Sequence, residues 1–228
     1  RCPLGEYRVR RIVLAIGNMH RPRMLGVPGE DLPHVSHYLE DPHKYLGKRV
    51  AIVGGRNSAV EAAIRLYRAG ARVTLCQRRP ELERDRIKYW LLPELEWLVK
   101  KQMVGFAPSS GVREIRDDAV VIERAGAREE LPADFVLLLT GYVQEPELFK
   151  MLGIQLEGDE RRPRLDRETM ETSVPGVYVA GTATGGSQAR ARVFIENSHE
   201  HVARIVRAVT GREPEVREPA VFEGYEEG

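Results

Sequence analysis

Apolar runs alternate with polar, glycine-punctuated stretches along this chain, and the clearest alternation lies in its first third. Residues 50–53 form a short apolar run, typical of a buried parallel strand. Gly54 and Gly55 follow it, and apolar residues then recur at helical spacing from Ala59 to Leu66. A second short apolar run begins after Gly70 and covers residues 72–76. The pattern predicts a βαβ unit with a glycine turn between its first strand and its helix.

Similar patterns predict the remaining elements. Buried strands are expected within residues 7–16, 135–139 and 177–180. Short strands separated by turns are expected at 104–106, 112–115 and 119–122. Helices are predicted from Pro93 and from about residue 191, the latter stopping at Gly211. The fold class is therefore predicted as α/β, with a Rossmann-like parallel sheet, flanking helices and a small antiparallel β-layer.

Composition and residue spacing argue against several classes of partner and site. The 228 residues carry 35 Lys+Arg against 34 Asp+Glu, which gives no excess of positive charge for nucleic acid or a membrane surface. No apolar run approaches the ~20 residues of a membrane span. Cys2 and Cys76 lie far apart, without a Cys-x-x-Cys motif, and His34, His37 and His43 fit no metal spacing. We expect no metal and a cytoplasmic location.

The glycine turn carries the first candidate site. Gly54, Gly55, Arg56, Asn57 and Ser58 match the dinucleotide-binding pattern G-x-G-x-x-G/A, except that Arg56 replaces the second glycine. Backbone N–H groups at such a turn and helix start can bind a pyrophosphate, and we expect Asn57 or Ser58 to cap the helix. A crossover that binds nothing is the alternative. Arg56 either points to solvent or contacts a phosphate, and we favour the second interpretation because its charge would reinforce the helix start.

The end of the second strand indicates which dinucleotide binds. An NAD site has Asp or Glu there for the ribose 2′-hydroxyl, whereas this chain has Gln77, Arg78 and Arg79. The forked guanidinium group of arginine matches the geometry of a 2′-phosphate. Arg78 and Arg79 therefore predict NADPH rather than NADH. A solvated basic loop is the alternative.

Several segments resemble flavoproteins related to thioredoxin reductase. Val-Leu-Ala-Ile-Gly at 13–17, Leu-Leu-Thr-Gly-Tyr at 138–142 and Val-Tyr-Val-Ala-Gly-Thr at 177–182 are similar to that family's domain-closing and FAD-contacting motifs. Within it, the chain is most similar to the bacillithiol-disulfide reductase family, which also places a basic residue at the second glycine. The segments that carry this likeness are residues 55–63, 87–90 with Pro93, 139–142, 168–172 and 194–197.

The resemblance implies an FAD-dependent oxidoreductase that passes hydride from NADPH to FAD and on to a disulfide such as bacillithiol disulfide. It places Lys88 and Gly141 in the NADPH site beside the glycine turn. It implies that the FAD site is lined by Gly17, Gly181, Thr182, Phe194 and Ile195. Thr182 stands where the family usually has aspartate, and no catalytic acid, base or nucleophile stands out.

The resemblance also implies a domain order. An FAD-domain segment and linker would cover 1–43, the NADPH domain 44–143 and a C-terminal FAD-domain segment 144–228. The family's first FAD fingerprint has no match here, so the chain is expected to be the C-terminal two-thirds of such a protein and to bind FAD weakly or not at all. Expected partners are a low-molecular-weight disulfide or a small redox protein, with a homodimer as a possible assembly.

Two other functions remain open. One is a ferredoxin- or flavodoxin-NADP reductase of thioredoxin-reductase-like fold. The other is a non-catalytic NADPH-binding module. Bound flavin, visible as yellow colour, would separate an enzyme from a binding module, and the electron acceptor would separate the two enzymes.

Overall fold

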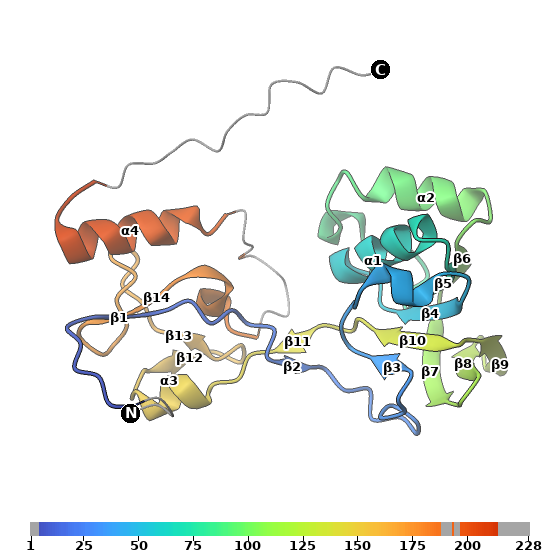
Figure 1. The fold of residues 1–228 in the computed structure, drawn as a ribbon, viewed down its shortest axis with the longest axis horizontal. Helices are drawn as coiled ribbons and strands as arrows, with labels where there is room; N and C mark the ends of the chain where they lie inside the picture. Colours follow the sequence, from blue (N-terminus) through green and yellow to red (C-terminus); the bar gives the residue numbers. More distant parts are fainter. Residues whose placement is uncertain (1–4, 188–192, 194–196, 214–228) are drawn as a thin grey trace, which may run out of the picture. The chain divides into compact units, whose positions relative to one another are not determined.

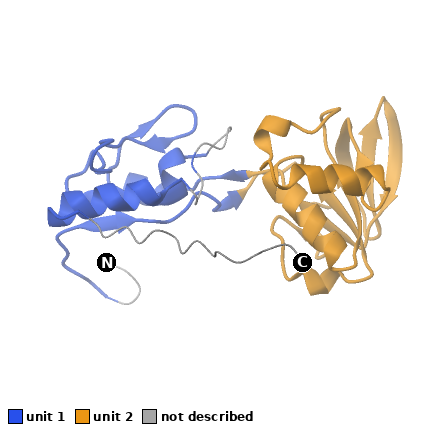
Figure 2. Cartoon of the chain, turned by 90° about the horizontal axis from the view of Figure 1, so that it is seen from above, with its two compact units in different colours: residues 1–21, 142–228 blue, residues 22–141 orange. Residues whose placement is uncertain are grey.

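The computed structural model describes residues 5–187, 193 and 197–213, and Figure 1 shows its elements in chain order. The chain divides into two compact units. One unit comprises residues 22–141, and the other comprises residues 1–21 with 142–228 (Figure 2).

The unit of residues 22–141 is built on a five-stranded parallel sheet in the order β3-β10-β4-β5-β6. Two helices and two short 3-10 segments, η1 and η2, accompany the sheet. The bounds are β3 Val35–Ser36, η1 Pro42–Tyr45, β4 Arg49–Val53, α1 Asn57–Arg68, β5 Arg72–Cys76, η2 Arg84–Arg86, α2 Leu92–Lys100, β6 Gly105–Ala107 and β10 Phe135–Leu138.

The alternation of side chains along β4 explains the layers of this unit. Val50 and Ile52 point into a core shared with α1 and α2. Ala51 and Val53 point into a second core on the opposite face. That face is covered by an antiparallel three-stranded sheet of β7 Ser110–Ile115, β8 Ala119–Arg124 and β9 Ala127–Pro132. The parallel sheet, helices and small antiparallel layer confirm the predicted fold class.

The unit starts earlier in the chain than the predicted NADPH domain. It begins at Pro22 rather than at residue 44. The physical reason is that β3 pairs with β10, Val35 lying opposite Val136. In addition, Val27 and Leu32 pack against the core under the antiparallel sheet. Residues 22–43 therefore belong to the same compact unit as the predicted nucleotide site.

The other unit contains the parallel pair β1 Ile12–Leu14 and β14 Val177–Val179. An antiparallel hairpin joins β12 Leu156–Glu157 to β13 Arg162–Pro163. A further two-stranded pairing joins β11 Tyr142–Val143 with β2 Arg21–Pro22, a strand that spans the point where the chain passes from this unit to the other. The helical segments are α3 Glu147–Met151, the 3-10 segment η3 Gly181–Gly185 and α4 His199–Thr210.

The last helix is shorter than its pattern suggested. α4 begins at His199 after Ser198 at the N-cap position, and Asn197 and Ser198 are not helical, whereas the predicted start at about residue 191 lies outside the described residues. Its end is as predicted: Gly211 has φ 69° and the left-handed conformation that stops a helix.

Candidate nucleotide site and its relatives

The turn after β4 requires glycine for reasons of space and backbone conformation. Gly54 has φ 156°. A Cβ added there would lie 2.6 Å from the Leu139 carbonyl oxygen and 2.8 Å from the Ala59 Cβ. The end of β10 and the start of α1 thus close on the turn from two sides. The backbone can take this path only without a side chain.

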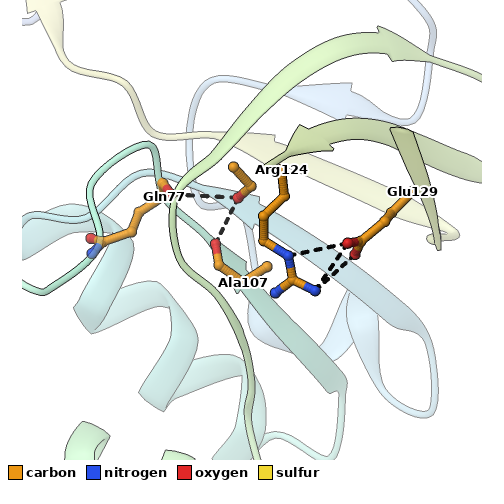
Figure 3. A network of polar contacts seen from close by, with 5 residues as sticks. Gln77, Ala107, Arg124 and Glu129 are labelled. Carbon is orange, nitrogen blue, oxygen red and sulfur yellow. Dashed lines mark hydrogen bonds and ion pairs between the residues drawn. The ribbon is translucent and has the colours of Figure 1, made fainter. Parts of the chain in front are cut away.

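Gly55 and Gln77 form the next contact of the site. A Cβ on Gly55 would clash with the amide oxygen of the Gln77 side chain. Gln77 is buried, and its Nε2 donates a hydrogen bond to the Arg79 carbonyl at 3.1 Å. The Gln77 carbonyl in turn accepts from the Ser110 hydroxyl, which also donates to the Ala107 carbonyl at 2.6 Å (Figure 3). Gln77 stands where an NAD site has Asp or Glu, and its hydrogen bonds hold the loop that carries Arg78 and Arg79.

At the start of helix α1, the backbone N–H groups donate to no capping side chain among the described residues. Its N-cap residue is Arg56. Asn57, expected as a cap, instead accepts a hydrogen bond from the Lys88 backbone N–H at 2.7 Å. Ser58 is exposed in the first turn. An uncapped helix start leaves backbone donors and a positive dipole end for an anion.

Basic side chains gather beside this helix start around one carboxylate. Glu83 Oε1 lies 2.7 Å from Arg79 Nη1 and 3.2 Å from Arg86 Nε, and its Oε2 lies 3.8 Å from Arg56 Nε. Burial lowers the pKa of the Arg56 guanidinium, and the positive charges of Arg86, Arg79 and Arg78 lower it further. Glu83 was not predicted from the sequence. The sequence carried no signal for it, because residues 78–83 form no helix in which an i,i+4 spacing would bring Arg79 and Glu83 together.

Lys88 and Gly141 lie in segments that meet the same turn. The backbone of Lys88 is tied to Asn57, and its Nζ stands 5.2 Å from the ring centroid of Trp90. Gly141 follows the end of β10, has φ 100°, and accepts a hydrogen bond from the Arg23 N–H at 2.9 Å. The uncapped helix, the side-chain-free turn and the arginines fit a phosphorylated dinucleotide.

The residues expected to contact FAD lie at the ends of β1 and β14. These strands are parallel, and the Ala180 N–H donates to the Leu14 carbonyl at 3.0 Å. Gly17 and Gly181 both have positive φ, at 70° and 72°. A Cβ on Gly17 would lie 3.8 Å from the Thr182 hydroxyl oxygen. The glycine-lined strand ends thus meet at one edge, where a cofactor can approach the backbone closely. Phe194 and Ile195 lie outside the described residues.

Cys76 does not supply a redox thiol. It is the last residue of β5 and is fully buried, which raises its pKa to about 12. The thiol therefore stays protonated near neutral pH. Cys2 lies outside the described residues. Over the ranges that the structure describes, no three metal-binding side chains come together, and no helix is long and apolar enough to cross a membrane.

Comparison with known proteins identifies the family. Residues 2–181 match the pyridine nucleotide-disulphide oxidoreductase family. The chain belongs to this family. The bacilliredoxin reductase Bdr of Bacillus subtilis is 38% identical over 209 residues, which are 91% of this chain and 64% of that protein. The bacillithiol disulfide reductase Bdr of Bacillus cereus superposes with a TM-score of 0.78 at 34% identity, over 89% of this chain and 62% of that one.

Other members of the family confirm the thioredoxin-reductase-like fold. The thioredoxin reductase of T. acidophilum superposes with a TM-score of 0.67 at 27% identity, over 80% of this chain and 60% of that one. A ferredoxin–NADP reductase of Ignicoccus hospitalis is 30% identical over 206 residues, covering 87% of this chain and 63% of that protein. The chain therefore spans less than two thirds of the length of these relatives. Membership of this oxidoreductase family implies FAD and NADPH as cofactors.

Proposed function

We propose that this chain contributes the NADPH site and part of the FAD site of an oxidoreductase that reduces a low-molecular-weight disulfide such as bacillithiol disulfide. The observation that carries the proposal is the placement of Arg78 and Arg79 at the C-terminal end of β5, beside the uncapped start of α1. Pyrophosphate on the helix and 2′-phosphate on the arginines is how a doubly wound sheet holds NADPH.

We propose that each compact unit binds a different cofactor. Residues 22–141 would form the NADPH domain, and residues 1–21 with 142–228 would form part of the FAD domain. In the first, Gly55 and Ser58 offer backbone donors to the pyrophosphate, whereas the Gly54 N–H already donates to the Cys76 carbonyl at 2.9 Å, and Gly54 contributes the turn without a side chain. In the second, Gly17 and Gly181 give close backbone approach at the ends of β1 and β14.

FAD supplies the redox chemistry when bound, since it accepts hydride and releases electrons to a second substrate. The residues of this chain bind and orient the cofactors. Because Cys76 is buried and protonated, we propose that electrons reach the substrate without this cysteine. A cytoplasmic location, where thiols are kept reduced, accords with this use. A homodimer remains a proposal supported by resemblance alone.

Electron-acceptor preference tests the proposal against its enzymatic alternative. The 30% identity to a ferredoxin–NADP reductase supports the alternative acceptor. The longer protein of which this chain is expected to be the C-terminal two-thirds, loaded with FAD and supplied with NADPH, is offered bacillithiol disulfide in one reaction and ferredoxin in another, with NADPH consumption as the readout. We expect turnover with the disulfide and little with ferredoxin. The reverse preference would replace the proposed substrate.

Flavin bleaching separates both enzymes from a binding module. Anaerobic NADPH should remove the visible absorbance of FAD bound to the longer protein that contains this chain. NADPH binding without any bleaching, under conditions in which FAD is bound, would favour the non-catalytic module instead.

A further inference from the structure

One carboxylate lies inside the arginine cluster that is proposed to bind the 2′-phosphate. The Glu83 side chain is 17% exposed, and both of its oxygens face guanidinium groups. The loop after β5 folds back so that Arg79, Arg86 and, from α1, Arg56 reach it from different directions. A carboxylate held in this way occupies the position that an anionic ligand of the cluster would seek.

The three arginine side chains differ in how easily each can move away from Glu83. The Arg86 side chain is 24% exposed, so it is held largely inside the loop. Arg79 is 50% exposed, and Arg56 is 45% exposed with the longest separation, 3.8 Å. Because the Arg79 side chain is reached by solvent and Arg86 also contacts Glu83, Arg79 can turn from Glu83 to a ligand without leaving the carboxylate unpaired. Arg78 forms no ion pair within the described residues, which leaves it available for the same ligand.

We propose that Glu83 is an internal counter-anion of the NADPH site, which keeps the arginines assembled in the free protein and is displaced from Arg79 by the 2′-phosphate. Without nucleotide, Glu83 offsets the mutual repulsion of the clustered arginines. With nucleotide, its charge opposes the incoming phosphate. Glu83 is thus a residue that sets affinity and specificity through the arginines. The inference rests on the proposed NADPH site.

Glu83→Gln tests the proposal because glutamine keeps the shape and removes the charge. Glu81→Gln is the matched control: Glu81 is exposed, lies two residues away, and its substitution changes the net charge equally. The 228-residue chain is titrated calorimetrically with 2′,5′-ADP and with 5′-AMP, which differ in the 2′-phosphate. We expect Glu83→Gln to bind 2′,5′-ADP roughly three- to tenfold more tightly than the original chain.

A gain in affinity that is limited to 2′,5′-ADP distinguishes competition between Glu83 and the 2′-phosphate from a purely structural role of Glu83. The binding of 5′-AMP should change by less than about twofold, and the gain for 2′,5′-ADP should shrink in about 0.5 M salt. Glu81→Gln should bind both nucleotides like the original chain. The unliganded Glu83→Gln chain should also melt at a lower temperature, because its arginines lose their counter-charge. A structural role alone would lower the melting temperature without tightening binding.

The other outcomes overturn the proposal. Unchanged or weaker binding of 2′,5′-ADP to Glu83→Gln, or an equal gain for 5′-AMP, would show that Glu83 does not compete with the 2′-phosphate. An original chain that binds neither NADPH nor 2′,5′-ADP would overturn the proposed NADPH site itself, and the role of Glu83 with it.

A crystal structure with 2′,5′-ADP gives a measurement that needs no variant. The guanidinium of Arg79 should contact the 2′-phosphate and no longer Glu83. If Arg79 keeps its 2.7 Å contact with Glu83 while 2′,5′-ADP is bound, the proposed displacement does not occur.

Discussion

The side-chain oxygen of Asn57 accepts a hydrogen bond from the Lys88 backbone N–H, with the two atoms 2.7 Å apart. Asn57 is the first residue of α1, and Lys88 follows η2 in the loop between β5 and α2. A residue type that usually caps helices here fastens a distant loop to the helix start. The same contact leaves the helix start without a side-chain cap, as the proposed pyrophosphate site requires.

Substitutions of Asn57 test what its hydrogen bond to Lys88 contributes to stability and to NADPH binding. Asn57→Ala removes the acceptor, and we expect the free energy of unfolding to fall by about 1 kcal/mol and NADPH affinity to fall about fivefold. Asn57→Asp keeps an acceptor but adds a negative charge, so stability should be retained while NADPH binds more weakly. Urea unfolding and calorimetric titration measure the two effects. An alanine variant unchanged in both would show that the tether is unimportant.

Arg56 gives a second prediction, since it occupies the N-cap position where the dinucleotide pattern expects glycine. We expect both Arg56→Gly and Arg56→Ala to weaken NADPH binding by roughly 3- to 30-fold, because each removes a positive charge beside the phosphate site. The loss should shrink as salt rises. Arg65→Ala, in the last turn of the same helix and paired with Glu61, is the control. Tighter binding by Arg56→Gly would mean that the side chain obstructs the site.

The sequence predicted the parts of the site that depend on local pattern. The strand predicted at residues 50–53 is observed as β4 Arg49–Val53, and it, the glycine turn and the apolar face of α1 follow from periodicity and glycine placement. Arg78 and Arg79 stay a prediction, made because the residue type at the end of the second strand distinguishes the two nucleotides.

The missed contacts depend on how the loop after β5 folds back. Glu83 meets Arg56 across 27 positions of sequence, and Asn57 meets Lys88 across 31. Nothing in the periodicity of residues 77–91 indicates these partners. β3 was missed for a related reason: two residues are too short to show a period, and only their pairing with β10 defines them as a strand.

The early start of the compact unit predicts which fragment folds. Residues 22–141 should unfold cooperatively, whereas residues 44–143 lack β3 and the packing of Val27, Leu32 and Val35. We expect the shorter fragment to be less stable by at least about 2 kcal/mol, because it exposes apolar surface along β10. Urea denaturation followed by circular dichroism compares the two. Equal midpoints and slopes would show that residues 22–43 are not part of this unit.

Asp134 predicts a pH dependence of stability. Its carboxylate accepts hydrogen bonds from the Arg49 side chain and backbone N–H, at 2.6 Å and 2.7 Å for the shortest of each. The Arg49 side-chain hydrogen bond is the main cause that lowers the pKa of Asp134 from 3.8 to about 2. A depressed pKa favours the folded state above the unfolded value. The contribution is therefore complete above about pH 4 and lost as pH falls towards 2.

Asp134→Asn checks this window. The difference in free energy of unfolding between the original chain and the variant should be constant from pH 7 to about 5 and should narrow as the pH falls below about 4. Glu123→Gln is a comparison from the antiparallel sheet: the Arg113 hydrogen bond lowers the pKa of this half-buried carboxylate too, so its stability difference should also narrow at acid pH. A difference that stays flat down to the lowest measurable pH would contradict the assigned role of the Arg49 pair.

Comparison of NADPH with NADH tests the central claim, that Arg78 and Arg79 hold a 2′-phosphate beside the helix start. Both nucleotides are titrated against the original chain, the Arg78→Ala, Arg79→Ala double variant and the Arg113→Ala control. We predict that the original chain binds NADPH more tightly by about 1.5–3 kcal/mol, roughly 10- to 150-fold, and that the double variant alone loses this preference. Equal affinities in the original chain, or a double variant that keeps the preference, would contradict the account.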